Sequence, residues 1–362
     1  MKKNDMLYIV ATQYDNLGDL IINKCMVDEI AKHGTLYLDT KNVSAEFQEV
    51  LLDNANVKPL SSITDVSLKG KGALSIPFVS KLKFDFLFKS PGPFGGIKSF
   101  GEFLRYWVFY YIFSTMRAKG CKSYFLGIDF MIQSKYDSIM QKMFSGVIGG
   151  FFLRSKKNVA VLKSGGIKNV EYIPDFCFLM REKVKGLPGK KKVGISFRDL
   201  ENAALNKNIT DAVDLYVDFY LKKNYDVYFF YQVDRDFAFN KALFEKFKHL
   251  DNVYFREKSL KYNEIDFYQD MFSALSNRLH VLLLGQIYGT IPVGLLDSNA
   301  KTSKIHNIYE TIGLSNLIFS SLNSADLGKI YDNKEAVAKE MERVNLEQYT
   351  LSTGIIKGLL TR

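Results

Sequence analysis

The chain has 362 residues, which is long enough for two domains of ordinary size. Apolar residues make up 47% and charged residues 24%, a globular composition. The formal net charge of +10 favours anionic partners: nucleic acid, an acidic membrane surface or phosphorylated small molecules. Lys and Arg are scattered, with only short clusters such as GKKK (189–192), so we expect no nucleic-acid binding.

The cysteines and aromatic residues set two further expectations. Cys25, Cys121 and Cys177 lack CxxC spacing, which predicts reduced, mostly buried thiols in a cytoplasmic protein and no zinc or disulfide framework. No signal peptide precedes the first strand-like segment, MLYIVAT (6–12). The 21 Tyr and 29 Phe predict an aromatic-rich core, with aromatic surface for sugar stacking as the alternative.

The first half of the chain alternates strand-like and helix-like segments. We expect helices at 20–32, about 101–118 and 135–149, and strands at 6–12, 35–40, 123–129 and the start of 84–96. This alternation predicts a mostly parallel, doubly wound sheet. Segment 103–113, FLRYWVFYYIF, is the most apolar piece but is too short to span a bilayer. It predicts a helix buried between sheet and solvent, or alternatively an element resting on a membrane.

A polar segment rich in Gly, Pro and Lys separates the two halves and predicts a linker at about 183–192. After it, strands are expected at 193–197, 225–232, 252–257 and 291–296, and helices at 210–223, 237–249 and from 325 onward. The sequence therefore predicts two similar α/β domains, 1–182 and 193–362. We expect the ligand in the cleft between them, because ligands of such sheets bind outside the strand carboxyl ends.

Two segments of the first domain are suited to ligand contact. Asp15, Asn16, Gly18 and Asp19 form a strand-to-helix turn, where Gly allows close backbone approach, Asp19 can cap the helix, and free N–H groups suit an anion or a sugar hydroxyl. The turn is not of the GxGxxG form, so no dinucleotide is indicated. Loop 89–96, KSPGPFGG, predicts a rigid wall of a cleft. The alternatives are that the turn at 15–19 only caps the helix and that loop 89–96 only connects two elements.

The second domain carries a cationic pattern. Arg198 follows a predicted strand, with a surface pair to Asp199 as the alternative. In SNRLHVLLLGQIYGTIPVG (276–294), we expect a buried helix from Asn277 or Arg278 to Tyr288, a turn at Gly289, and then a strand. The helix N-terminus and Arg278 favour an anion, and His280 can exchange a proton near neutral pH.

These segments together resemble the polysaccharide pyruvyl transferase family. The likeness covers most of the chain in order, and the Arg-Leu-His segment is its most specific part. It is carried by NLGD (16–19), the loop after DFLFKSPG (85–92), YFLGID (124–129), 151–180, GISFRD (194–199) and 276–301. The family commonly has Arg-Asp-Ser in its middle element, whereas Ser155 and Lys156 follow Arg154 here, which puts the role of the absent aspartate in doubt.

The resemblance implies two Rossmann-like domains in a GT-B-like arrangement, with the active site in the interdomain cleft. It also implies transfer of pyruvate from phosphoenolpyruvate to a hexose of a bacterial surface polysaccharide or its lipid-linked precursor, as a cyclic ketal. Phosphoenolpyruvate carries a phosphate and a carboxylate, so its site needs at least two cations. We expect Arg198 and Arg278 there, with Lys301 and Gly289, and His280 as general acid and base.

The first domain is then expected to bind the hexose at the end of a polyprenyl diphosphate through Asp15, Asn16, Gly18, Asp19, Ser90 and Gly92. No metal and no resident cofactor are expected. A lipid carrier would explain the positive charge and exposed aromatics through contact with the anionic inner face of the plasma membrane. A homo-oligomer is left open. The alternatives are a nucleotide-sugar glycosyltransferase of the same shape and a non-catalytic sugar- or lipid-binding protein.

Overall fold

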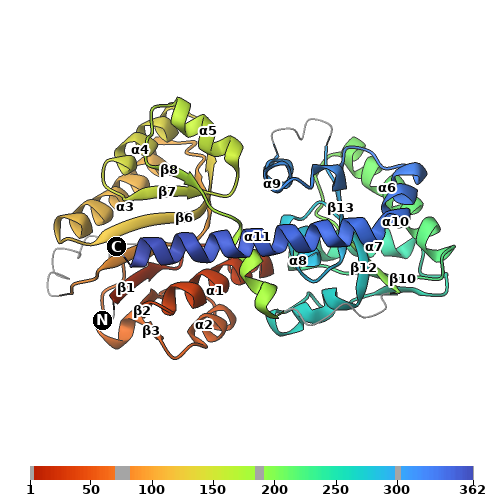
Figure 1. Cartoon of the computed structure of the whole chain (residues 1–362), viewed down its shortest axis with the longest axis horizontal. Coiled ribbons are helices and arrows are strands. Elements are labelled where there is room, and N and C mark those ends of the chain that lie inside the picture. The colour runs from red at the N-terminus through yellow and green to blue at the C-terminus, as the bar shows by residue number, and fades with distance from the viewer. Residues whose placement is uncertain (1–3, 70–81, 184–190, 298–302, 362) are drawn as a thin grey trace. The chain divides into compact units, whose positions relative to one another are not determined.

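The computed structural model describes residues 4–69, 82–183, 191–297 and 303–361, which form two compact units (Figure 1). Unit 1 comprises Met1–Tyr14, Asp19–Phe176 and Leu351–Arg362, and unit 2 comprises Asp15–Gly18 and Cys177–Thr350. The change between units therefore comes at Phe176, earlier than the predicted domain end at residue 182. Most of the predicted linker, 184–190, lies outside the described residues.

Two short segments do not belong to the unit that is expected from their position in the chain. Asn16 forms an isolated antiparallel bridge with Val233, so the turn at Asp15–Gly18 belongs to unit 2. The Asn4 amide donates to the carbonyl of Leu360 at 3.1 Å, which ties the C-terminal end of the chain to unit 1. In both cases contacts with residues far away in the chain determine the unit to which the segment belongs, and these contacts cannot be read from the order of the elements.

Unit 1 is built on a fully parallel sheet with the order β3-β2-β1-β4-β6-β7-β8, and β5 pairs with β6. Its central strands are buried on both faces, which explains their continuous apolar sequences. The strands are β1 (Asn4–Ile9), β2 (Gly34–Asp39), β3 (Val57–Pro59), β4 (Phe86–Lys89), β5 (Gly92–Gly95), β6 (Lys122–Met131), β7 (Gly150–Leu153) and β8 (Val170–Tyr172).

The helices of unit 1 begin at side-chain caps. Ser44, Ser99 and Ser155 each accept a hydrogen bond from a backbone N–H in the first turn of the helix that follows. The helices are α1 (Leu17–Ala31), α2 (Ala45–Leu52), α3 (Phe100–Ala118), α4 (Lys135–Ser145), α5 (Lys156–Ser164) and the 3-10 helix η1 (Leu60–Ser62). Figure 1 shows α3 and α4 beside β6 and β7, and α1 and α2 beside β1 to β3.

An aromatic core fills the space beneath α3 and α4, as the composition predicts. Phe113 and Phe125 have ring centroids 4.9 Å apart, and Phe94 packs edge-on against Phe144 at 5.2 Å. All four rings are buried. The three cysteines are buried as well, in line with expectation.

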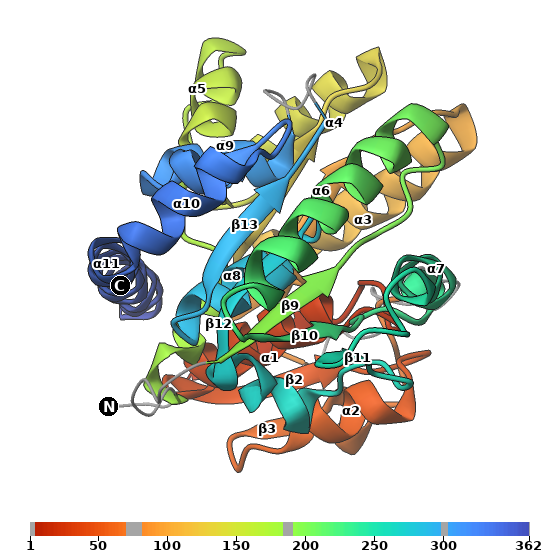
Figure 2. The same cartoon turned by 90° about the vertical axis from the view of Figure 1, so that its right-hand side faces the viewer.

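Unit 2 repeats the plan with a parallel sheet of order β11-β10-β9-β12-β13-β14. Its strands are β9 (Lys192–Ser196), β10 (Asp226–Phe229), β11 (Val253–Phe255), β12 (Met271–Ser276), β13 (Ile291–Leu295) and β14 (Ile318–Phe319). Its helices are α6 (Ala203–Leu221), α7 (Phe237–Glu245), α8 (Leu279–Ile287), α9 (Lys304–Ile312), α10 (Ser324–Asp332) and α11 (Lys334–Leu360), with the 3-10 helices η3 (Phe176–Lys183), η4 (Asp234–Asp236), η5 (Tyr262–Asp270) and η7 (Ser315–Leu317). The part of α11 from Leu351 onward belongs to unit 1. Figure 2 shows α6 in front of this sheet, and α8 lies against β12 and β13.

Both sheets have the Rossmann strand order, so each has a point where the order reverses. This topological switch point lies between β1 and β4 in unit 1 and between β9 and β12 in unit 2. Ligands of such sheets bind outside the strand carboxyl ends at this point. The predicted class of two doubly wound α/β domains is therefore confirmed, and the topology marks one candidate site in each unit.

Several predicted boundaries need correction. The first helix begins at Leu17 and not at Leu20, because the Asn16 side chain caps it by accepting from the N–H of Gly18 at 3.0 Å. The helix expected at 210–223 begins at Ala203, where Asn202 is the cap. Strand β12 was not predicted. The aromatic helix α3 is buried only near its C-terminal end, and much of its N-terminal half is exposed.

Among the described helices, none combines the length and the apolar character that crossing a bilayer requires.

Candidate functional site

The switch point of unit 2 places Arg198 and Arg278 on neighbouring strands. Arg198 follows β9, and Arg278 follows β12 as the residue that precedes α8. The Asn277 amide accepts from the N–H of Arg198 at 2.8 Å and donates to its carbonyl at 2.9 Å. This two-way bond fixes the backbone of Arg198 at the beginning of α8, so the two predicted arginines meet at the carboxyl edge of one sheet.

Asp236, which sequence reasoning missed, anchors the guanidinium of Arg278. It lies in η4, after β10, and forms an ion pair with Arg278. The Asp236 side chain is 2% exposed and that of Arg278 is 14% exposed, so the pair is largely shielded from water. The backbone N–H of Arg278 donates to the Ser276 hydroxyl at 2.9 Å, which fixes the turn from β12 into α8.

Three arginines act on the single carboxylate of Asp236. Burial raises the pKa of Asp236, while Arg278, Arg235 and Arg198 lower it. Burial lowers the pKa of Arg278; Asp236 opposes this shift, and the like charges of Arg198 and Arg235 add to it. Arg198, Arg235 and Arg278, called the basic cluster below, therefore carry more positive charge than Asp236 balances.

The simplest alternative for Arg198 does not hold. Asp199 accepts from the N–H of Glu201 and from the Asn206 amide, each at 2.7 Å. Within the described part of the chain, no ion pair joins Arg198 to Asp199, and the Arg198 side chain is exposed. Its guanidinium is therefore accessible to an anionic ligand.

His280 lies in the first turn of α8, beside the basic cluster, and is 8% exposed. The turn at Asp15–Gly18 packs directly against it. A β-carbon on Gly18 would lie 2.1 Å from the Nδ1 atom of His280, so only glycine fits at this position. The structure thus brings together Asn16, Gly18, Arg198, Arg278 and His280, which the sequence places far apart.

Two predicted donor residues do not join this group. Gly289 has a φ of +73° and donates to the carbonyl of Gln286 at 3.0 Å, so it ends α8. It follows His280 by nine residues, which is roughly 13 Å along a helix. Gly289 therefore lies at the opposite end of α8 and serves the turn into β13, which corrects its assignment to the donor site. Lys301 lies outside the described residues.

The predicted acceptor residues have mixed placements. The Asp19 carboxylate accepts from the Thr12 hydroxyl at 2.8 Å, so it braces the end of β1 and does not cap α1. Ser90 is fully buried, and its hydroxyl accepts from the N–H of Ala11 at 2.9 Å and donates to the carbonyl of Ile9. Gly92, with a φ of +125°, shapes the loop, and Asp15 is exposed. The hydrogen bonds of Asp19 and Ser90 thus serve the fold.

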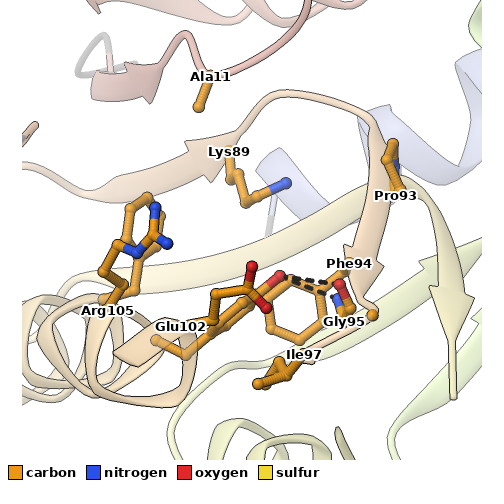
Figure 3. A pocket seen from close by; sticks show the side chains of 11 residues that line it. Ala11, Lys89, Pro93, Phe94, Gly95, Ile97, Glu102 and Arg105 are labelled. Carbon is orange, nitrogen blue, oxygen red and sulfur yellow. Dashed lines mark hydrogen bonds between the residues drawn. The ribbon is translucent and has the colours of Figure 1, made fainter. Parts of the chain in front are cut away.

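A pocket of about 420 Å³ lies at the switch point of unit 1, beside these loops (Figure 3). This volume suits a small ligand such as one sugar ring. Ala11 follows β1, Lys89 ends β4, and α3 supplies the opposite wall. The lining residues are Ala11, Lys89, Pro93, Phe94, Gly95, Gly96, Ile97, Glu102, Arg105, Tyr106 and Phe109.

Lys89 is the unusual group in this pocket. It is 9% exposed, and its ammonium donates to the carbonyl of Ser90 at 3.2 Å and lies 5.9 Å from the centre of the Phe94 ring. No carboxylate of the described residues forms an ion pair with it. Burial lowers the pKa of Lys89 to about 8. Figure 3 shows it reaching into the pocket from the strand, with Glu102 and Arg105 on the helix side.

Arg154, which the sequence identifies only as part of the family's middle element, forms buried ion pairs. It is fully buried between Asp129 and Asp175, and its distance to Asp175 is 2.7 Å. Burial alone would lower the pKa of Arg154, but the two carboxylates more than offset this and raise it. The motif arginine is therefore held in an internal ion triad at the end of β7, where it stabilises the loops of unit 1.

The fold of the whole chain is similar to that of UDP-N-acetylglucosamine 2-epimerases. The enzyme from Neisseria meningitidis bound to UDP-GlcNAc matches with a TM-score of 0.64 and 12% identity, over 99% of this chain and 100% of that one. A putative UDP-N-acetylglucosamine 2-epimerase from Listeria monocytogenes gives 0.62 and 10%, over 98% and 94%. Anabaena HepE in complex with UDP-glucose gives 0.56 and 10%, over 98% of each chain.

No family model and no curated protein sequence matches this chain. At identities this low the structural likeness establishes the fold, two parallel-sheet α/β domains of the GT-B-like kind, and the chemistry must be argued from the residues.

Proposed function

We propose that this chain is a transferase of glycan synthesis that binds a phosphorylated donor at the basic cluster of unit 2. The observation that carries this proposal is the convergence of Arg198, Arg235 and Arg278 beside the first turn of α8. A phosphate there would meet guanidinium donors with fork geometry as well as the positive end of a buried helix.

We propose phosphoenolpyruvate as the donor. It carries a carboxylate as well as a phosphate, so it can use more than one arginine of the cluster. The Arg-Leu-His segment, which resembles that of the polysaccharide pyruvyl transferases, supports this choice. It supplies Arg278 for charge and His280 for proton transfer on one helical turn.

The reaction balances without a metal or redox partner. One sugar hydroxyl adds to the central carbon of the donor, and the methylene carbon takes a proton, which we assign to protonated His280. The adding hydroxyl gives its own proton to the imidazole that results, which restores the acid. Phosphate then leaves with its electron pair, assisted by the basic cluster, and an oxocarbenium ion remains. A second hydroxyl of the same sugar adds to this ion and gives its proton to the departed phosphate, which completes the cyclic ketal.

The pocket of unit 1 is the proposed acceptor site. Its volume suits one hexose, and its polar groups lie on opposite walls, with Lys89 on β4 and Glu102 and Arg105 on α3. The predicted contacts of Asp15, Asn16 and Gly92 with the acceptor stay predictions, as does a shared interdomain cleft. The lipid-diphosphate portion of the acceptor is also a proposal.

A nucleotide-sugar donor is the second candidate, and the structural neighbours favour it. Among them, the Neisseria meningitidis enzyme was solved with UDP-GlcNAc, Anabaena HepE with UDP-glucose and S. aureus MnaA with UDP. The same basic cluster would then bind a diphosphate, and His280 would act as a base. The two candidates differ in the donor that binds and in the product released.

Phosphate release from phosphoenolpyruvate tests the proposal, with galactose-, glucose- and mannose-terminated lipid diphosphates as acceptors. We expect acceptor-dependent release that is lost in His280→Ala and kept in His249→Ala, an exposed histidine of the same unit. Calorimetric titration with phosphoenolpyruvate and with UDP-sugars runs in parallel. Binding of a UDP-sugar without binding of phosphoenolpyruvate would replace the first candidate by the second.

A further inference from the structure

Helix α3 of unit 1 exposes an apolar stripe. Phe100, Leu104, Trp107 and Tyr111 are 60%, 50%, 43% and 43% exposed. Their spacing of four, three and four residues places them on one face of the helix. The opposite face carries Ile112, Phe113 and Met116 into the core. An amphipathic helix normally presents polar residues to water, so this outer face is unusual for a helix covered by solvent alone.

The apolar surface continues onto the neighbouring helix α4. The ring of Phe103 lies 6.1 Å from Phe100, 6.4 Å from Trp107 and 4.8 Å from Tyr136 of α4, measured between centroids. More exposed apolar side chains stand on α4 and just before it: Met131, Ile132 and Ile139. We call this surface, with the stripe on α3, the α3–α4 face; Figure 1 shows the two helices side by side.

The exposed charges of both helices are all positive. Arg105 and Arg117 on α3 and Lys135 and Lys142 on α4 are exposed. Arg105 lines the pocket and Arg117 donates to the carbonyl of Gly146, whereas Lys135 and Lys142 flank the exposed Ile139 of α4. The acidic residues are engaged elsewhere. Glu102 is half-buried in the pocket wall and accepts from the N–H of Lys98 at 2.7 Å.

Asp137 is buried and accepts from three backbone N–H groups, those of Ile97, Gln133 and Ser134. This face is therefore an apolar surface flanked by two exposed lysines, Lys135 and Lys142.

We propose that the α3–α4 face docks unit 1 on the surface of an anionic lipid bilayer. Aromatic and aliphatic side chains enter the boundary between headgroups and acyl chains, and Lys135 and Lys142 attract anionic headgroups. A symmetric pairing of two copies through this face would bring like charges together, which disfavours a second copy as the occupant.

Docking would place the pocket of unit 1 at the membrane surface, because α3 contributes Glu102, Arg105, Tyr106 and Phe109 to the pocket wall. A sugar held on a lipid carrier would then reach the pocket without leaving the bilayer. This consequence rests on the proposed function, whereas the docking itself does not.

The single tryptophan of the chain provides a direct probe, because Trp107 lies in the stripe. The protein is mixed with vesicles of phosphatidylcholine alone or with roughly 30% phosphatidylglycerol added, which supplies anionic headgroups. We expect binding to the anionic vesicles only, a blue shift of tryptophan emission, and quenching by brominated acyl chains. High salt should weaken the binding, because it screens the headgroup charge.

Two pairs of substitutions separate the face from the rest of the surface. Lys135→Gln with Lys142→Gln should weaken binding by about thirtyfold, since each cation near the surface contributes about fivefold. Leu104→Ser with Tyr111→Ser should remove the emission shift. The matched controls in unit 2, Lys258→Gln and Tyr254→Ser, change exposed residues of the same types and should bind normally.

Three outcomes would overturn the proposal. Unchanged binding in both pairs of variants would do so, as would pelleting with vesicles without any change in Trp107 emission. A vesicle-free dimer that the Leu104→Ser and Tyr111→Ser pair dissociates in sedimentation velocity would show that a second copy covers the face. Circular dichroism melts of each variant confirm that the fold is intact before binding is compared.

Discussion

The two switch points of this molecule share a topology and differ in chemistry. In unit 2 the strand ends carry three arginines around one buried carboxylate, and two of these arginines are exposed. In unit 1 the corresponding strand ends form a pocket with a single buried lysine and no carboxylate paired with it in the described ranges. The same sheet topology thus supports an exposed, strongly cationic site in unit 2 and a pocket of mixed charge in unit 1, because the side chains at and beyond the strand ends differ.

The comparison also shows two ways of holding a positive charge at a strand end. The charge of Arg278 is paired with the carboxylate of Asp236, which the protein itself supplies. The ammonium of Lys89 has a carbonyl and an aromatic ring as neighbours, and burial lowers its pKa to about 8. Lys89 can therefore bind an anionic or hydroxyl-bearing ligand in the pocket. Substitutions at the two sites should therefore affect stability in opposite directions.

Removing Arg278 should have the largest effect. Arg278→Ala leaves the Asp236 carboxylate buried without its ion-pair partner, which should lower the free energy of unfolding by about 3–5 kcal/mol. Phosphate release should fall below detection. Urea denaturation of the variant measures the loss of stability.

The double variant Arg278→Met with Asp236→Leu replaces the pair by apolar groups. It should regain most of the stability without regaining activity. Equal instability of the single and double variants would contradict the assignment of Arg278 as the charge that Asp236 holds.

Lys89→Met should stabilise the protein while it impairs acceptor use. The pKa of Lys89 falls from 10.5 to about 8 on folding, so at pH 7 the buried charge destabilises the folded state by up to about 3 kcal/mol. The wild type should gain stability between about pH 8 and pH 10.5, where the unfolded chain still binds the proton and the folded chain has lost it. The advantage of the variant should disappear over this range.

Denaturation at pH 7 and pH 10 measures this difference between Lys89→Met and wild type. Lys98→Met is the control, because Lys98 is exposed and its removal should change stability little at either pH. A pH-independent difference for Lys89→Met would show that packing, and not charge, is responsible.

Gly18→Ala tests whether the turn at Asp15–Gly18 positions His280. The added β-carbon would overlap the imidazole, so the ring must move, and a displacement of about 1 Å can reduce turnover roughly a hundredfold. Steady-state phosphate release should show a lower kcat with a smaller change in the donor KM. Gly328→Ala in α10 is the matched control, because a β-carbon there meets no atom within 4 Å. Normal turnover in Gly18→Ala would remove His280 from the proton-transfer role.

The sequence predicts those parts of the molecule that depend on local pattern. We expect the α8 helix from Asn277 or Arg278 to Tyr288, and it is found at Leu279–Ile287, because a polar start, a mostly apolar segment and a terminal glycine are readable in order. The placement of Arg198 after a strand was readable for the same reason.

Residues that act through distant contacts were not predictable. Asp236 looks like an ordinary turn residue until η4 brings it to Arg278. In the sequence Lys89 is only a polar residue at the end of a strand; the structure places it in a pocket whose opposite wall is α3. Asp15–Gly18 belong to unit 2 through contacts with Val233 and His280, both more than two hundred residues away in the chain.

Arg235 should give the smallest effect and the sharpest test of how the basic cluster works. Its side chain is exposed, so Arg235→Gln removes a screened charge and should leave stability unchanged. The donor KM should rise about fivefold at low salt, with kcat preserved, and the difference from wild type should shrink as salt is added. Lys258→Gln, also exposed in unit 2, should leave KM unchanged.

A salt-independent rise in KM would mean that Arg235 contacts the donor directly. A loss of kcat would mean that it contributes to the departure of phosphate. Either result would give Arg235 a role equal to that of Arg278, and the cluster would then be a three-point clamp and not a pair of arginines with a distant third charge.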